Sequence, residues 1–513
     1  YVINLQMLLF CSRICLIRSI DNTLFDIAAV LVLRGNEKTC VPLNNAIKLS
    51  KKVKIIEKVL DNGRKMCSQG LKTKRFSGRP HMKNTVLTLR ERLFSIIRRL
   101  GEEPKRYARN PGRNFTRKRT LTPAVLIYLI VTMDEKSIWK GLLGHFRKRI
   151  DTPSASAFTQ QRQKLLPSAL EDMFHHFSDH LRPQKKFQGY RLLAVDGSSL
   201  KSGTYPADED AYRPGTEHQH GWNSFHINAL FDLENGIYTD VIVQKEHTKH
   251  ESRALCQMTA RSTISDPVIV LADRNYEAYN NFACLEKHGW KYLIRIRDRD
   301  RKNAYGIKLP DSPELDLPVR MTLGRLTPKQ LRQHGIPVPE HYYRLPNSIP
   351  FDFLGTESAD FYSFSARIVR LKRKDGKTQM LMTNLDAAQF PLSALRELYA
   401  RRWGIETSFR ELKYTVGLIH LHSRKSDLVL QEIFAAFTVF NFTRAAAWNT
   451  NEGCSSSKYK RRVNFAHAVY LCCELLRGER TEITGLLERV LTPRRPDRLY
   501  PRPLTRTGLL MPD

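Results

Sequence analysis

One segment, from residue 190 to residue 297, constrains the fold of this chain most, because strand-like and helix-like stretches follow one another there in a definite order. Apolar stretches that predict strands cover residues 190–196, 222–233, 237–243, 267–273 and 290–297. Helical periodicity separates the last three of them, at about 251–262 and 276–288. Asn235-Gly236 is a strong hairpin signal between the second and third stretches, and Thr248 and Glu251 have the spacing of a capping box. The predicted order is therefore β-β-β-α-β-α-β.

This order of elements is that of the ribonuclease H-like fold, so the sequence predicts an α/β protein with a mixed sheet of that type. Residues 298–390 contain prolines and strand-like stretches, with a hairpin turn at Asp375-Gly376, and we interpret them as a β-rich insertion. The sheet domain would then be formed by residues 187–297 and 391–450, on either side of the insertion.

The chain is strongly basic, with 84 Lys and Arg against 51 Asp and Glu and a formal net charge of +33. Much of the excess lies in residues 51–149, which hold 27 Lys and Arg and only 7 Asp and Glu. Such a charge attracts polyanions, and nucleic acid is the partner that we expect, although a solvated basic surface would give the same count. Short helices with arginines between their apolar positions predict an all-α basic DNA-binding domain at 82–186.

The two ends of the chain have less pattern. Residues 1–81 form an irregular N-terminal extension that we expect to be non-native, with Met82 as the working start, and its apolar runs are too short to span a bilayer. Residues 451–513 are expected to form a C-terminal helical region with a basic tail. The nine cysteines are scattered without a paired CxxC arrangement, which disfavours a zinc finger and favours reduced thiols in the cytoplasm.

Two of the predicted strands end on an aspartate, Asp196 and Asp273. A carboxylate at such a point is unfavourable unless it is hydrogen-bonded, paired or bound to a cation. Glu406 is the third candidate, because its helix also carries cations suited to phosphate. Mg²⁺ prefers carboxylate oxygens together with substrate phosphate, and two such ions can promote an in-line phosphoryl displacement. Together the three acids predict metal-assisted chemistry on a nucleic-acid backbone, whereas each one alone could simply cap a loop or form an ion pair.

Glu406 belongs to a predicted helix at 392–416. If each residue turns by about 100°, one stripe of this helix carries Tyr399, Arg402, Glu406 and Lys413. Arg402 could also form an i,i+4 pair with Glu406, but Lys413 has no acidic neighbour at that spacing and is expected to bind phosphate. Other acids fit the site less well, because they lie off the stripe, cap a helix or belong to the hairpin turn: Glu397, Glu411, Glu251, Asp232 and Glu234.

These residues resemble the YREK-type insertion-sequence transposases of the DDE superfamily. The family signature Y-x2-R-x3-E-x6-K is reproduced by Tyr399, Arg402, Glu406 and Lys413. Val195-Asp196-Gly197-Ser198 resembles the first-aspartate motif of the family, and residues 271–276 resemble the second. The resemblance covers about residues 84–450. One position departs from the pattern, because the family usually has Gly or Ala two residues after the second aspartate and this chain has Asn275.

The resemblance implies a bacterial cut-and-paste DNA transposase. The catalytic acids, which would hold two Mg²⁺ ions with Mn²⁺ able to substitute, would be Asp196, Asp273 and Glu406. The side chains that contact DNA phosphates would be Tyr399, Arg402 and Lys413. In relatives a tryptophan in or near the insertion stacks on a flipped base, and Trp290 is the nearest candidate here, although it also fits a packed core. His218 and His220 lack further ligands at a metal-binding spacing, so we assign them to a loop.

The expected partners are double-stranded DNA, at the transposon ends and at the target, and a second copy of the chain on that DNA. We expect no membrane association and no nucleotide cofactor, because the chain contains no GxxxxGK sequence. The expected location is the cytoplasm, at the nucleoid. Two alternatives stay open: a non-catalytic, sequence-specific DNA-binding protein, which includes a decayed transposase, and a ribonuclease H-like nuclease without strand transfer.

Overall fold

A computed structural model provides the structure of the chain. It describes residues 86–117, 119–133, 137–181, 185–217, 220–297, 303–305, 307–373, 376–448 and 461–493. The expectations for the extension 1–81, Met82, His218, Asp375 and the tail after Pro493 fall outside these residues. His220 is described and lies in an exposed loop.

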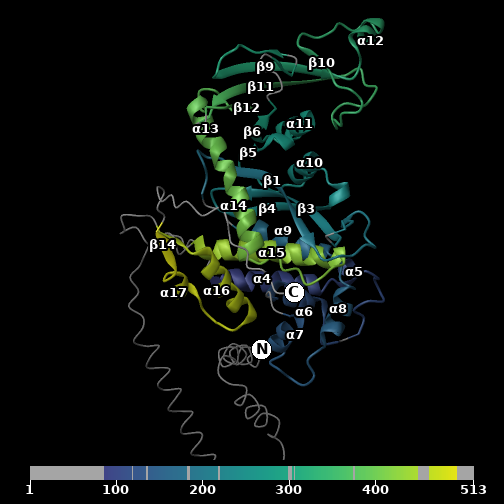
Figure 1. Ribbon diagram of the computed structural model, residues 1–513, viewed down its shortest axis with the longest axis vertical. Helices are drawn as coiled ribbons and strands as arrows, with labels where there is room; N and C mark the ends of the chain where they lie inside the picture. The colour runs from purple at the N-terminus through teal and green to yellow at the C-terminus, as the bar shows by residue number, and fades with distance from the viewer. Residues whose placement is uncertain are drawn as a thin grey trace, which may run out of the picture. The chain divides into compact units, whose positions relative to one another are not determined.

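The first five long strands in the chain form the mixed sheet that carries the candidate site (Figure 1). They are β1 (Arg191–Ser202), β3 (Trp222–Asp232), β4 (Ile237–Lys245), β5 (Val268–Ala272) and β6 (Lys291–Ile296). β1 pairs antiparallel with β3 and parallel with β5, β3 pairs antiparallel with β4, and β5 pairs parallel with β6. The order β4-β3-β1-β5-β6 confirms the predicted α/β class with a mixed, ribonuclease H-like sheet.

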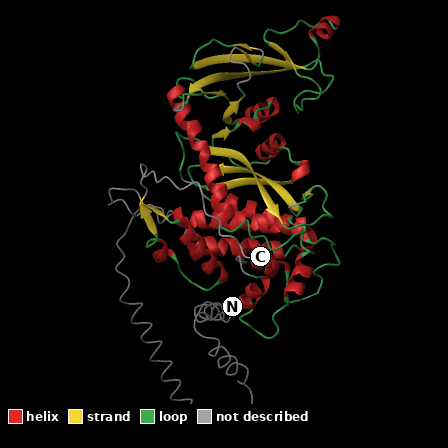
Figure 2. Ribbon diagram, in the orientation of Figure 1, coloured by secondary structure: helices red, strands yellow, loops and turns green. Residues whose placement is uncertain are grey.

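The strands between residues 298 and 390 extend this same sheet beyond β6 (Figure 2). The extending strands are β12 (Thr378–Thr383), β11 (Phe361–Lys372), β9 (Leu315–Gly324) and β10 (Tyr342–Arg344), in that order from β6. β11 and β12 form the predicted hairpin, and β12 pairs antiparallel with β6. Two short strands, β7 (Asn303–Ala304) and β8 (Ile307–Lys308), pair only with each other, and β2 (Tyr212–Arg213) pairs with the start of β3. A short helix, α12 (Pro328–Gln333), joins β9 to β10.

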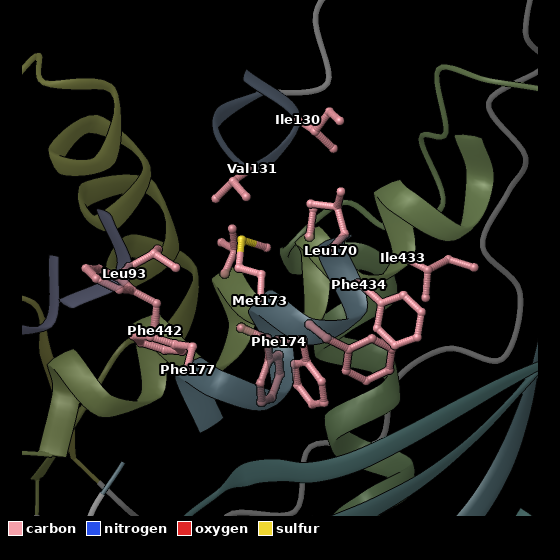
Figure 3. Close-up of a cluster of buried hydrophobic side chains, with 14 of the residues drawn as sticks. Leu93, Ile130, Val131, Leu170, Met173, Phe174, Phe177, Ile433, Phe434 and Phe442 are labelled. Carbon is pink, nitrogen blue, oxygen red and sulfur yellow. The ribbon is translucent and has the colours of Figure 1, made fainter. Parts of the chain in front are cut away.

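The helices before the sheet pack around one long helix near the end of the chain, α15 (Ser426–Trp448). The earlier helices are α4 (Val86–Gly101), α5 (Pro104–Tyr107), α6 (Pro123–Thr132), α7 (Ile138–His145), α8 (Ala155–Arg162) and α9 (Ser168–His180). α15 is buried along most of its circumference, as expected for a helix that is apolar on all sides. Its phenylalanines meet those of α9, so that Phe434 lies against Phe174 and Phe442 stacks on Phe177 (Figure 3). The helical region predicted at 82–186 is therefore present, and it shares a core with α15 and β4.

Elements that follow α15 in the chain pack against it or against one another, with α16 in contact with α15. They are α16 (Phe465–Arg477), α17 (Thr484–Leu487) and a ribbon of β13 (Arg461–Val463) and β14 (Leu491–Pro493). Within the described ranges, no helix combines the length and the hydropathy that crossing a bilayer requires.

Two helices, α10 (Glu251–Ala260) and α11 (Tyr279–Lys287), pack against each other beside the strands that carry the candidate acids. The predicted capping box is wrong. The chain forms a 3₁₀ turn, η1 (Glu246–Thr248), and α10 begins only at Glu251, with His250 as the N-cap residue whose ring nitrogen accepts from the amide of Arg253.

The prediction of reduced thiols is wrong for one pair of cysteines. Cys256 on α10 and Cys284 on α11 form a disulfide, with their Cα atoms 5.7 Å apart. The packing of the two helices brings these thiols together across 28 residues of sequence, a distance that no local spacing motif encodes. Neither Cys472 nor Cys473 forms a disulfide with another described residue, and Cys472 is buried.

The predicted helix at 392–416 is not one regular α-helix. It consists of α13 (Leu392–Ala400), a 3₁₀ turn η3 (Arg401–Trp403), α14 (Gly404–Arg410) and a π-helical turn η4 (Glu411–Thr415). A 3₁₀ turn is wound more tightly than an α-helix and a π turn more loosely. A constant rotation of about 100° per residue therefore does not describe the whole segment, and the positions of its polar side chains must be taken from their contacts.

Candidate active site

Asp196 lies within β1, which continues beyond it to Ser202 rather than ending there as the sequence suggests. The strand continues because β3 pairs with it along its whole second half, from Asp196 opposite Ala229 to Ser202 opposite Asn223. The Asp196 Oδ1 atom accepts a hydrogen bond of 2.8 Å from the Gly197 amide. The pKa of Asp196 is raised to about 6. Burial is the main cause, and the negative charges of Asp273 and Glu406 also contribute to the rise.

Asp273 follows the last residue of β5 and caps the 3₁₀ turn η2 (Arg274–Tyr276). Its Oδ1 atom accepts a hydrogen bond of 2.9 Å from the Asn275 amide. Because β1 and β5 are parallel and Val195 lies opposite Ala272, the two aspartates follow the last pair of the β1–β5 ladder at the same level of the sheet. The parallel pairing thus brings the two predicted aspartates side by side.

Arg402 connects the first aspartate to the glutamate of the interrupted helix. Its Nη1 atom lies 3.3 Å from Asp196 Oδ2, and its Nη2 atom lies 2.8 Å from Glu406 Oε1. The pairing of Arg402 with Glu406, which the spacing allowed, is thus present. Arg402 is buried, and its Nε atom has no hydrogen-bond partner within the described part of the chain. The Arg402 guanidinium therefore faces the carboxylates of Asp196 and Glu406, and the charge of a third carboxylate, Asp273, acts on Asp196.

Tyr399 and Lys413 complete the set of predicted residues around this point. The Tyr399 hydroxyl donates to the Ala272 carbonyl at 3.4 Å, and burial raises the pKa of Tyr399 to about 12. The Lys413 ammonium donates to the Ser199 carbonyl on β1 at 2.7 Å, and burial lowers its pKa. Lys413 therefore has a partner that the sequence did not reveal, the backbone of a distant strand. All six predicted residues lie around one end of the β1–β5 pair.

The acids fit divalent cations by their chemistry, since hard cations prefer carboxylate oxygens and three acids outnumber the single cation between them. They are not packed as the ligands of a single ion. In the part of the chain that the structure describes, only Cys256, Cys284 and Asp352 bring three such ligand atoms within 4.8 Å of one another. Two ions about 3.5–4 Å apart do not require all three acids on one of them. The residues present therefore suit divalent cations by the chemistry of their oxygen atoms.

The acids that the sequence set aside divide into two groups. Asp232 binds Arg191 at 3.0 Å and accepts from the hairpin amides, Glu234 pairs with Arg401, and Glu411 pairs with Arg444, so these three have structural partners. Glu251 is different. It pairs with His226 at 2.9 Å beside Gly197, although the sequence assigned it to a cap. No local signal could have identified this pair, because the register of β3 on β1 brings His226 there.

The expectation that Trp290 fits a packed core is confirmed. Trp290 is only 3% exposed and packs against His288 in the core, so it is not available to stack on a base. Trp403 and Tyr414 are 63% and 65% exposed, and each directly follows one of the predicted DNA-contacting cations in the sequence. Of these two exposed rings, that of Trp403 lies against the Arg402 guanidinium, 5.6 Å from its central carbon.

Comparison with known proteins gives the following similarities. Residues 187–442, which include all six predicted residues, match the family described as "Transposase DDE domain". The chain is 34% identical over 346 residues to "Transposase InsG for insertion sequence element IS4" of Escherichia coli strain K12, an alignment that covers 64% of this chain and 70% of the relative. Among solved structures, a piggyBac transposase synaptic complex with hairpin DNA matches with a TM-score of 0.40 and 14% identity, over 83% of this chain and 89% of that one.

Proposed function

Because the chain belongs to the DDE transposase family, whose members transfer phosphoryl groups with the help of divalent metal ions, we propose that it cuts DNA at the ends of an insertion sequence and joins those ends to target DNA. The observation that carries this proposal is that Asp196 and Glu406 converge on Arg402, while Asp273 lies close enough for its charge to raise the pKa of Asp196. A cluster with more acids than cations is suited to metal-assisted phosphoryl transfer.

In this proposal Asp196, Asp273 and Glu406 hold two Mg²⁺ ions, and Mn²⁺ substitutes for them. When bound, such a metal pair would activate the attacking oxygen and neutralise charge on the leaving oxygen. In the first step a water oxygen bonds to phosphorus at the transposon end, and the bond from phosphorus to the 3′ oxygen breaks. In the second step the released 3′-hydroxyl attacks a target phosphate and displaces another 3′ oxygen. The second step conserves the number of phosphodiester bonds, so it needs no nucleotide hydrolysis.

We further propose a YREK-type site, in which Tyr399, Arg402 and Lys413 hold the phosphates of the cleaved strand. An ammonium has three donors and Lys413 uses one on the Ser199 carbonyl, so two remain for phosphate. Arg402 contributes a planar guanidinium, a group that suits phosphate oxygens. Trp403 is a better candidate than Trp290 for stacking on a displaced base, because its ring is exposed.

The remaining parts of the proposal concern DNA as the partner. The basic helices of residues 82–186 would bind double-stranded DNA at the transposon ends, and two copies of the chain would pair two ends. The high positive charge supports this assignment, since it gives a general attraction to DNA. The protein would act in the cytoplasm, at the nucleoid.

The test is a cleavage assay on a supercoiled plasmid that carries both ends of the parent element, with Mg²⁺ or Mn²⁺. The wild-type chain should nick and linearise this plasmid, and Asp196→Asn should bind the ends equally well without cutting them. The matched control is Asp266→Asn, which removes an acid paired with Lys186 at 2.7 Å outside the candidate site. A wild-type chain that binds the ends but cuts no better than Asp196→Asn would favour the non-catalytic DNA-binding alternative. Cleavage without any joined product would favour a nuclease.

A further inference from the structure

A second polar network adjoins the two aspartates, and it is built on His226 and Glu251. His226 lies on β3 directly opposite Ser199 of β1, and its Nδ1 atom is 3.4 Å from the Ser199 hydroxyl. Its Nε2 atom is 2.9 Å from Glu251 Oε1, at the first residue of α10. The His226 side chain is 6% exposed and the Glu251 side chain 22%. The pair thus joins the sheet to the helix beside the candidate site.

On one side, this pair contacts the backbone that carries Asp196. A Cβ atom placed on Gly197 would lie 2.5 Å from His226 Nε2 and 2.8 Å from Glu251 Oε1, which is closer than real Cβ contacts. Only a glycine can therefore follow Asp196 while the pair holds this position. The two side chains pack against β1 at Gly197, immediately after Asp196.

On the other side, the pair contacts the turn that carries Asp273. The pKa of Glu251 is lowered mainly by its interaction with His226, whose Nε2 atom lies 2.9 Å away, and an interaction with the Asn275 side chain also lowers it. The backbone amide of Asn275 in turn donates to Asp273 Oδ1 at 2.9 Å. Glu251 is thus linked to Asp196 through Gly197 and to Asp273 through Asn275. Asn275 is the position at which this chain departs from the usual Gly or Ala, and its side chain supplies the link.

Glu251 differs from the candidate ligands in its partner, because it pairs with His226, whereas Asp196 and Glu406 pair with Arg402. Partners that hold the ligands of a metal ion typically change its affinity by about 10–100-fold when they are removed. We propose that His226 and Glu251 form a positioning pair that fixes Asp196 and Asp273 relative to each other for cation binding. This inference rests on the proposed function, since it assigns the pair to the same acids.

The first measurement is Mn²⁺ binding to the full chain without DNA, followed by electron paramagnetic resonance of free Mn²⁺. Glu251→Gln keeps the shape of the side chain but removes its charge, and it should weaken Mn²⁺ binding by about 10-fold. Asn275→Ala removes the side chain that faces Glu251 but keeps the backbone amide that donates to Asp273, and because the position is exposed the variant should fold normally and weaken binding in the same direction. The double variant should be no weaker than the stronger single variant, because both changes break one connection. Asp266→Asn should bind Mn²⁺ like the wild-type chain.

The second measurement is the rate of plasmid nicking as a function of Mg²⁺ concentration. Glu251→Gln and Asn275→Ala should shift the half-maximal Mg²⁺ concentration upward by about 10-fold and regain most of the rate at high Mg²⁺. A merely structural role would lower the melting temperature and the rate without this shift. Unchanged Mn²⁺ binding in both variants would overturn the inference even if the wild-type chain cuts DNA. If the wild-type chain binds Mn²⁺ but never cuts DNA, the proposed function fails, and the inference is still decided by Mn²⁺ binding.

Discussion

Two buried arginines in this protein lie among acidic side chains, and they differ in how fully their surroundings satisfy them. Arg162 donates to Gln431 at 2.7 Å, to Glu432 at 2.8 Å and to the Leu428 carbonyl at 2.5 Å. It is 1% exposed, and it ties α8 to α15. Arg402 faces Asp196 at 3.3 Å and Glu406 at 2.8 Å, and its Nε atom has no partner among the described residues.

The difference separates a network that stabilises the fold from one that is suited to bind something. The Arg162 network pairs one cation with one carboxylate and adds neutral acceptors, so little charge is left over. The Arg402 network adds the charge of Asp273 to those of Asp196 and Glu406, and this excess of acids contributes to the raised pKa of Asp196. An excess of like charge beside buried groups is unfavourable for stability, and such arrangements are concentrated at functional sites.

The largest expected effect, and the clearest test of the contrast between the two arginine networks, is a substitution of Asp196. Asp196→Asn should lower the rate of DNA cleavage by about 10⁴-fold, which corresponds to about 5.5 kcal/mol of activation free energy. The same change should leave the melting temperature equal or higher, because it removes one of the repelling charges. Single-turnover cleavage and thermal unfolding measure the two effects on the same preparation. If the variant lost stability along with activity, Asp196 would instead belong to a network that stabilises the fold.

The second prediction concerns the satisfied arginine. Arg162→Met should destabilise the protein by about 3–5 kcal/mol, because it leaves Glu432 buried without its cation. The measurement is the urea midpoint of the full chain, with Arg149→Met as control, since Arg149 pairs with Asp151 in an exposed position and should change stability by less than about 0.5 kcal/mol. If the urea midpoint of Arg162→Met were no lower than that of Arg149→Met, the buried Arg162 network would not stabilise the fold.

The third prediction refines the role of the cations in the open network. Lys413→Met keeps the aliphatic part of the side chain and removes its charge, so it should reduce cleavage by about 10-fold, or about 1.4 kcal/mol. Its effect should shrink as salt concentration rises, since phosphate contacts weaken with salt. Lys201→Met is a suitable control, because Lys201 lies over the Trp222 ring and makes no described contact with the acids. Equal losses in both variants would indicate a general effect of charge.

The smallest expected effect is on pH dependence. Burial alone would raise the pKa of Glu432, but the hydrogen bond from His422 and the charge of Arg162 hold it below the usual value of 4.5. The ionised form is therefore favoured in the folded state. Its contribution is complete above pH 4.5 and is lost as the pH falls through the lowered pKa.

The measurement is the difference in free energy of unfolding between the wild-type chain and Glu432→Gln, taken from pH 7 downward. This difference should be constant above pH 4.5 and should narrow below it. A difference that stays constant down to low pH would mean that Glu432 does not titrate with folding.

The sequence predicts the parts of the site that depend on local pattern. The strand ending before Asp273 and the four-residue spacing from Arg402 to Glu406 follow from local periodicity and are present in the structure, whereas the strand ending predicted at Asp196 is wrong because β1 continues to Ser202. The pair of His226 and Glu251 could not be predicted in this way. It depends on the register of one strand on another and on where α10 begins, and both are set by the packing of the whole sheet.

The same reason explains two other differences. The 3₁₀ and π turns on either side of α14 follow from tertiary contacts, among them the bond from Lys413 to the Ser199 carbonyl. The disulfide between Cys256 and Cys284 follows from the packing of α10 on α11. Propensity and periodicity report on single segments, so they cannot reveal which distant segments will meet.

The hydrogen-bonded path from the inserted strands to the second aspartate has a mechanical consequence. β12 pairs with β6, and β6 pairs with β5, the strand directly before Asp273, so one continuous hydrogen-bonded sheet joins the inserted strands to the candidate site. A force applied to β11 or β12, for example by bound DNA, would therefore be transmitted through backbone hydrogen bonds to the turn that carries Asp273.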